Sequence, residues 1–204
     1  MTVIHTAIML RRALRLASLL FLIVAIPGAG AAQADDVPLR WWLQVVQADG
    51  EPLVSVPMPP SAGWCMAWNH SVEGFTVNDC YRNRNGRMVL ERSHLPDFAA
   101  GLDHIPGRGR QRSDGHGGYW IEDIDEPVPG NRYRLRVGGP AVNHRLISRG
   151  TPELETLVQR ARQRGLPVQL PRSGDADMTP ISLSDTAADR AVTVQLIERD
   201  PADP

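Results

Sequence analysis

Most of the chain after Arg40 consists of short apolar or alternating runs that are broken at close intervals by Gly, Pro, Asn and Asp. This pattern is typical of β-strands joined by tight turns. The predicted strands lie within residues 41–50, 53–60, 63–70, 75–83, 87–94, 117–124, 132–139, 143–148, 178–183 and 191–198. We therefore expect an all-β fold, mainly antiparallel, arranged as a sandwich or a partly open barrel.

One segment, TPELETLVQRARQRG at residues 151–165, has the periodicity of a helix instead. Thr151 is a candidate N-cap, Pro152 fits the first helical position, and Gly165 follows an arginine-rich last turn. Four apolar side chains share one face: Leu154, Leu157, Val158 and Ala161. The sequence predicts a single helix packed on the sheet.

The hairpin that spans residues 63–83 can be aligned by its side-chain pattern. If SVEG, residues 71–74, is a four-residue loop built on a type I turn, the numbers of facing residues sum to 145. A mostly apolar face then carries Trp64, Met66, Trp68, His70, Phe75, Val77, Asp79 and Tyr81. A slip by one residue would mix this set with the polar face, so the pattern favours the 145 register.

The same register places Cys65 directly opposite Cys80. Facing residues in an antiparallel pair lie about 4.5–5.5 Å apart at Cα, which is within the range of a disulfide. These are the two cysteines of the chain, and disulfides persist in exported proteins. We predict a Cys65–Cys80 disulfide.

The first 34 residues have the order of a secretory signal. Arg11, Arg12 and Arg15 precede an apolar run at residues 16–26, and small residues lead to Ala-Gln-Ala before Asp35. The run is short for a membrane span, which needs about 20 residues. We expect a cleavable signal peptide at residues 1–34, a single β-rich domain at residues 35–200 and a disordered tail at residues 201–204. The alternative for the N-terminal segment is a retained membrane anchor.

The net charge of the chain limits the classes of molecule that the protein is expected to bind. The chain of 204 residues has a net charge of -1, and all 22 basic residues counted as Lys or Arg are arginine. There is no bulk attraction to nucleic acid, so no nucleic-acid partner is expected. The glycine-rich stretch at residues 96–118 predicts a long loop, in which Arg108, Arg110 and Arg112 either gather an anion or are simply solvated.

The stretch WNHSVEG, residues 68–74, combines a histidine, a hydroxyl and a carboxylate, but in a turn. His70 and Glu73 are not the helical i, i+4 histidine pair of a zinc protease, and the chain has no CxxC, GxSxG or GxGxxG motif. No metal or cofactor is expected on this ground. Three roles remain for His70: a hydrogen-bonded structural residue at the hairpin end, a ligand contact, or a metal-binding or catalytic group assembled with distant residues such as Asp103, His104, His116 and His144.

Four segments give the chain a resemblance to a known family: HSVEGFTVNDCY at 70–81, PDFAAGLDHIP at 96–106, GGYWIEDIDEPVPG at 117–130 and RVGGPAVNHRL at 136–146. With them the mature chain resembles the small exported bacterial proteins of domain of unknown function 1850. In that family acidic residues typically precede the tyrosine that matches Tyr81, and here Asn78 and Asp79 occupy those positions. The resemblance implies residence in the periplasm, or secretion, and genes next to the permease of tripartite ATP-independent periplasmic (TRAP) transporters of the TAXI type.

Two function classes follow. The first is a non-enzymatic accessory or binding module that contacts a membrane or solute-binding subunit of such a transporter, or a small solute, and is no integral membrane protein after cleavage. Its candidate binding residues are His70, Ser71, Glu73, Tyr81 and His144. The second class is a metal-binding protein or metal-dependent hydrolase that uses His70 with other histidines.

Overall fold

The computed structural model describes residues 39–60, 62–96, 106–148, 152–169 and 180–200. The expected signal peptide, the C-terminal tail and the Thr151 N-cap lie outside the described residues. Twelve strands are present in the described part: β1 (Trp41–Val46), β2 (Pro52–Pro57), β3 (Gly63–Asn69), β4 (Thr76–Arg84), β5 (Arg87–Leu95), β6 (Arg110–Ser113), β7 (Tyr119–Glu122), β8 (Glu126–Pro127), β9 (Arg132–Arg136), β10 (Arg145–Ser148), β11 (Ile181–Ser182) and β12 (Ala191–Glu198).

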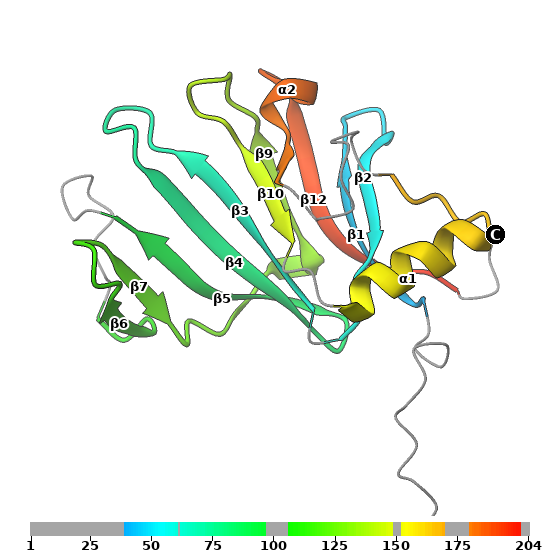
Figure 1. The fold of residues 1–204 in the computed structure, drawn as a ribbon, viewed down its shortest axis with the longest axis horizontal. Coiled ribbons are helices and arrows are strands. Elements are labelled where there is room, and N and C mark those ends of the chain that lie inside the picture. The colour runs from blue at the N-terminus through cyan, green and yellow to red at the C-terminus, as the bar shows by residue number, and fades with distance from the viewer. Residues whose placement is uncertain (1–38, 61, 97–105, 149–151, 170–179, 201–204) are drawn as a thin grey trace, which may run out of the picture. The chain divides into compact units, whose positions relative to one another are not determined.

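The strands form two antiparallel sheets, which Figure 1 allows the reader to follow. The smaller sheet has the order β2-β1-β12-β9, and the larger has the order β11-β10-β3-β4-β5-β7-β6 with β8 paired to β5. One buried apolar cluster contains side chains of both sheets, including Leu43 and Val194 from the smaller and Met66 and Leu146 from the larger. The two sheets therefore pack face to face as a sandwich, and the predicted all-β class is confirmed.

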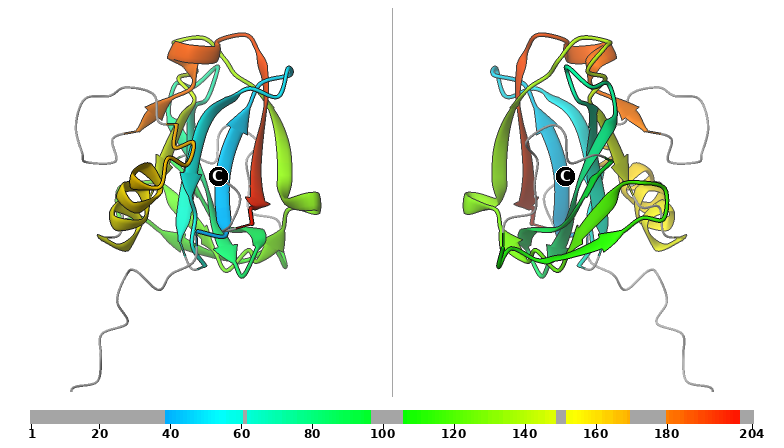
Figure 2. Two further views of the ribbon diagram at one scale, coloured as in Figure 1. Left: turned by 90° about the vertical axis from the view of Figure 1, so that its right-hand side faces the viewer. Right: turned by 90° about the vertical axis from the view of Figure 1, so that its left-hand side faces the viewer.

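The predicted helix is α1 (Pro152–Gln163), and it packs on the outer face of the smaller sheet. Leu157 and Ala161 of α1 form a second buried cluster with Leu39 and Trp42. Figure 2 shows α1 to one side of the strands in both views. Because β1 is covered by the sandwich core on one face and by α1 on the other, its sequence WWLQVV is nearly continuous in apolar residues.

The hairpin of β3 and β4 has the predicted register. Its pairs run from Gly63 opposite Arg82 to Asn69 opposite Thr76, and every pair sums to 145. Cys65 and Cys80 are bonded, with their Cα atoms 4.0 Å apart. The turn is closed by hydrogen bonds from His70 N–H to Phe75 O (2.8 Å) and from Gly74 N–H to His70 O (2.9 Å). Gly74 has a φ of 73°, a left-handed conformation that glycine adopts readily.

The prediction of one long loop at residues 96–118 is wrong over residues 110–113. These residues form β6, which pairs with β7, and Arg110 and Arg112 bond the carboxylates of Asp123 and Glu122 on the adjacent segment. The segment RQRS carries no strand signal because all four residues are exposed on an edge strand. A short helix, α2 (Ser184–Ala187), was also not predicted. The described residues contain no helix that is long and apolar enough to cross a membrane.

Candidate functional site

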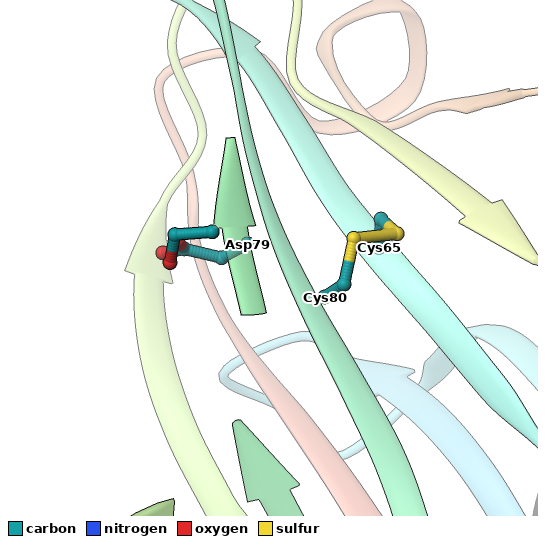
Figure 3. Close-up of a disulfide and its surroundings, with 4 residues drawn as sticks. Cys65, Asp79 and Cys80 are labelled. Carbon is teal, nitrogen blue, oxygen red and sulfur yellow. A yellow bond between two sulfur atoms is a disulfide. The ribbon is translucent and has the colours of Figure 1, made fainter. Parts of the chain in front are cut away.

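A group of polar side chains interrupts the apolar inner face of the larger sheet. One row of facing residues crosses this sheet in the order Leu146, Met66, Asp79, Ser93 and Ile121. All but Asp79 and Ser93 are apolar, and Ser93 is buried. Figure 3 shows Asp79 and the Cys65–Cys80 disulfide on opposite sides of β4, as the alternation of a strand requires. Asp79 therefore faces the smaller sheet rather than solvent on the disulfide side.

A β-bulge in β5 arranges the neighbours of this row. Cys80 faces Arg92, but Tyr81 faces Leu90, so Glu91 is the extra residue. An unbroken ladder would have placed Glu91 opposite Tyr81 on the inner face. The bulge instead leaves apolar Leu90 beside Tyr81, and the Glu91 carboxylate pairs with Arg82 at 2.9 Å. Bulges of this kind are frequent next to functional sites, where they redirect a side chain.

Three aromatic rings form a stack across the sandwich. Tyr81 of β4 lies between Trp64 of β3, with ring centroids 5.7 Å apart, and Tyr133 of β9, at 5.1 Å. Trp64 is fully buried, and its indole Nε1 has no hydrogen-bond partner in the described structure. The Tyr133 hydroxyl is buried too, although the residue is partly exposed, and it lies near the Tyr81 hydroxyl and the Trp64 indole without hydrogen-bond geometry to either. Trp64 Nε1 and the Tyr133 hydroxyl thus lie together in the interior, and neither makes a hydrogen bond of ordinary geometry.

Asp79 is the charged group of this cluster. Ser93 Oγ donates a hydrogen bond of 2.6 Å to Asp79 Oδ1. Burial raises the pKa of Asp79 above its usual value, and the Ser93 hydrogen bond and the positive charge of Arg108 oppose that rise. Arg108 is fixed nearby because it bonds Glu126 through both Nε (2.7 Å) and Nη2 (2.9 Å). The Asp79 carboxyl thus holds its proton more readily than an exposed aspartate.

The two tyrosines of the cluster remain protonated. Burial raises the pKa of Tyr81, with a further contribution from the negative charge of Asp79. Burial also raises the pKa of Tyr133 well above its usual value. Neutral phenols beside a carboxyl group and an indole N–H offer hydrogen bonds to a bound group, and this chemistry serves recognition better than nucleophilic attack.

The candidate residues His70, Ser71 and Glu73 lie together in the turn between β3 and β4. Ser71 and Glu73 are exposed, as predicted for a turn. His70, which the 145 register puts at the end of the apolar face, is only half-buried. Its Nδ1 accepts the backbone N–H groups of Val72 (3.4 Å) and Glu73 (3.3 Å), and its ring stacks on Phe75 at 5.3 Å. His70 therefore caps the turn through backbone donors.

Replacing His70 by alanine should lower the free energy of unfolding by about 0.5–1 kcal/mol, because two long, partly solvated hydrogen bonds and one ring contact are lost. Glu73→Gln, in the same exposed turn, should change it by less than about 0.5 kcal/mol. Chemical denaturation of both variants measures this. If His70→Ala is as stable as Glu73→Gln, His70 has no structural role in the turn.

His144 lies outside this turn, immediately before β10, and is buried. Its Nδ1 accepts the Gly138 backbone N–H at 2.9 Å, and its ring stacks on Trp68 at 6.4 Å. Its own backbone N–H donates to Ser184 Oγ at 2.9 Å, which ties it to α2. Burial lowers the pKa of His144, so the imidazole stays neutral. These contacts give His144 a structural function, and its part in ligand binding stays a prediction.

The five predicted binding residues thus lie in three places: the β3–β4 turn, the sandwich interior and the start of β10. Among the described residues there is no group of three or more His, Cys, Asp or Glu side chains that could hold a metal ion. Asp103 and His104 lie outside the described residues. Among the described residues, the His94 ring contacts a carboxylate, with Nε2 2.8 Å from Asp114 Oδ2. Because Asp114 also accepts the backbone N–H groups of His116 and Gly118, this pair holds the loop before β7.

Of the residues in this interior cluster, the sequence analysis gave Tyr81 as a candidate binding residue but not Asp79, Ser93, Trp64 or Tyr133. A signal for Asp79 was present, since the 145 register puts this single carboxylate on a face whose other residues, apart from His70, are apolar or aromatic. Tyr133 also alternates inward between exposed arginines in RYRLR. Their proximity depends on the packing of two sheets, which no local pattern contains.

Residues 65–154 match the model of the family described as domain of unknown function (DUF1850). This part of the chain belongs to that family. The DUF1850 segment includes Asp79, Tyr81, Ser93, Arg108 and Tyr133, so nearly the whole interior cluster lies within it. A search of curated proteins found no match to the chain, and neither did a search of solved structures.

Proposed function

We propose that the protein is an exported, non-enzymatic binding module whose site is the interior cluster of Asp79, Tyr81, Trp64 and Tyr133. The observation that carries this proposal is the pair of buried polar atoms, Trp64 Nε1 and Tyr133 Oη, neither of which has a partner at hydrogen-bond geometry in the described structure. Buried polar groups in folded proteins nearly always have a partner, because leaving one unpaired costs about 1–3 kcal/mol. A bound group with hydrogen-bond acceptors, such as a carboxylate or carbonyl of a small solute, would satisfy both donors.

Export is supported by the Cys65–Cys80 disulfide together with the signal-like order of residues 1–34. Structural disulfides persist in oxidising compartments such as the bacterial periplasm and are rare in the cytosol. We propose that the mature domain acts in the periplasm or is secreted.

The proposed partner is a membrane or solute-binding subunit of a TAXI-type TRAP transporter. This part of the proposal rests on the family resemblance, since family members tend to be encoded beside the permease of these transporters. The domain would then present its solute, or sense it, next to the transporter. His70, Ser71 and Glu73 lie in the β3–β4 turn, where Ser71 and Glu73 are exposed and His70 is half-buried. Their side chains can contact such a partner.

Gentle purification of the tagged protein from native membranes, followed by mass spectrometry of co-purifying proteins and of small molecules released by denaturation, tests this function. We expect transporter subunits and a small solute with an acceptor group to accompany the wild type. Tyr133→Phe, which removes one buried donor, should reduce the recovered solute about tenfold.

The matched control is Tyr119→Phe, the same change at a buried tyrosine of β7 in the same sandwich core. It should recover as much solute as the wild type. Equal recovery from all three proteins, or no solute from any, would refute the interior cluster as a binding site. Absence of transporter subunits from every preparation would remove the proposed partner while leaving the solute result intact.

A further inference from the structure

Three arginines project from the outer face of β9. In the sequence RYRLR, Tyr133 and Leu135 pack against the core, while Arg132, Arg134 and Arg136 are all exposed. Alternate residues of a strand lie about 6.6–6.8 Å apart on the same face, so the three guanidinium groups form a regular row. We refer to these three residues as the arginine row.

The arginine row differs from those arginines of the described chain that neutralise carboxylates of the protein itself. Six of those are paired in this way: Arg40, Arg82, Arg84, Arg108, Arg110 and Arg112. Within the described residues, the arginine row makes no ion pair and no side-chain hydrogen bond. Its positive charge is therefore directed at solvent or at a partner.

The strand that carries this row is an edge strand. β9 ends the smaller sheet, with β12 on its inner side and no further strand beyond it in the described structure. An edge strand presents backbone N–H and C=O groups that an extended segment of another chain can bond. Charged side chains on an edge protect it from pairing with copies of itself, since like charges would face each other.

We propose that β9 is a docking edge for an extended acidic segment of a partner protein, which adds to the smaller sheet as a strand. Its backbone would pair with β9, and Asp or Glu at alternate positions would lie beside Arg132, Arg134 and Arg136. Opposite charges on facing residues of neighbouring strands attract, whereas a second copy of β9 would bring arginine against arginine. Charge complementarity thus favours an acidic partner over self-association. The arginine row lies on the face of β9 opposite Tyr133, and the proposal does not depend on the function proposed for the interior cluster.

Two synthetic peptides of the same composition test the proposal: one in which aspartate alternates with threonine, and one in which the aspartates are contiguous. Only the alternating peptide can place its carboxylates in register with the row. Calorimetric titration of the mature protein should show tighter binding of the alternating peptide, and hydrogen exchange should slow at the β9 amides when it binds. Affinity should fall as salt is added, because exposed ion pairs are screened.

The variant R132Q/R134Q/R136Q should weaken binding of the alternating peptide by about tenfold or more, since three exposed ion pairs are lost. The matched control R87Q/R162Q/R164Q removes the same total charge from exposed arginines of β5 and of the segment at the end of α1. It should bind the peptide as the wild type does.

The proposal is overturned if the two peptides bind equally, if the two triple variants weaken binding equally, or if hydrogen exchange at β9 does not change. If the wild type binds neither peptide but binds vesicles of phosphatidylglycerol through the arginine row, the row recognises a lipid surface and not an acidic segment, and the proposal is wrong. Sedimentation of the wild type as a dimer that R132Q/R134Q/R136Q does not form would identify a second copy, and this too would overturn it.

Discussion

Replacing Cys65 and Cys80 together by alanine should lower the free energy of unfolding by about 3 kcal/mol, the value for removal of a cross-link that closes a loop of this length. The disulfide spans 15 residues of sequence and joins facing positions of β3 and β4. Without it the unfolded chain gains conformational freedom, while the hairpin keeps its hydrogen-bonded ladder. Urea denaturation of the variant and of the oxidised wild type measures the difference.

The wild type treated with dithiothreitol is the control for this variant. Cys80 is almost fully buried, so the alanine variant loses packing as well as the cross-link. The reduced wild type keeps both sulfur atoms and should show most of the loss of about 3 kcal/mol without the packing component. If reduction leaves the stability unchanged, the disulfide does not stabilise the fold. It is then weaker support for the proposal that the protein is exported.

The β3–β4 hairpin was predictable because its information is local. Apolar side chains alternate on both arms, the turn SVEG ends in a glycine, and only the 145 register keeps the two faces separate. The facing positions of the two cysteines followed from that register. The helix α1 was predictable for the same reason, since Pro152 begins it and Leu154, Leu157 and Ala161 mark its buried face.

The interior cluster was not predictable in the same way, because its members meet only when the two sheets pack. Tyr133 reaches Tyr81 from the edge strand of the other sheet, and Ser93 faces Asp79 only because of the register of β5. The bulge at Glu91 leaves no local signature in the sequence. His70 shows the opposite case: its face was predicted, but its half-exposed position at the end of the strand was not.

The second large effect concerns pH. Because burial raises the folded-state pKa of Asp79 above the ordinary value of 3.8, the folded protein binds its proton more tightly than the unfolded chain does. The stability that the folded protein gains from this tighter proton binding is fully present below pH 3.8 and is lost as the pH rises through the folded-state pKa of Asp79. An asparagine side chain does not titrate, so Asp79→Asn should match the wild type in acid and become the more stable protein as the pH rises toward neutrality.

Thermal melting of Asp79→Asn and wild type from about pH 3.5 to pH 8 measures this difference. Each 1 kcal/mol of added stability at neutral pH would raise Tm by roughly 2–4 °C for a domain of this size. Ser93→Ala is the control, because it removes the hydroxyl that bonds the Asp79 carboxylate and should lower stability most at neutral pH. If the wild type instead becomes the more stable protein as the pH rises, the Ser93 hydrogen bond and the charge of Arg108 outweigh the effect of burial on the Asp79 pKa.

The Asp79→Asn result also bears on function. A buried carboxylate that costs stability at the pH at which the protein works is retained only if something other than folding requires it, and binding sites commonly carry such a cost. We therefore expect Asp79→Asn to melt higher than the wild type at neutral pH and to recover less solute in the native purification, in parallel with Tyr133→Phe. A variant that is more stable and recovers the solute in full would place Asp79 outside the binding site, although Trp64 and Tyr133 would still supply its donors.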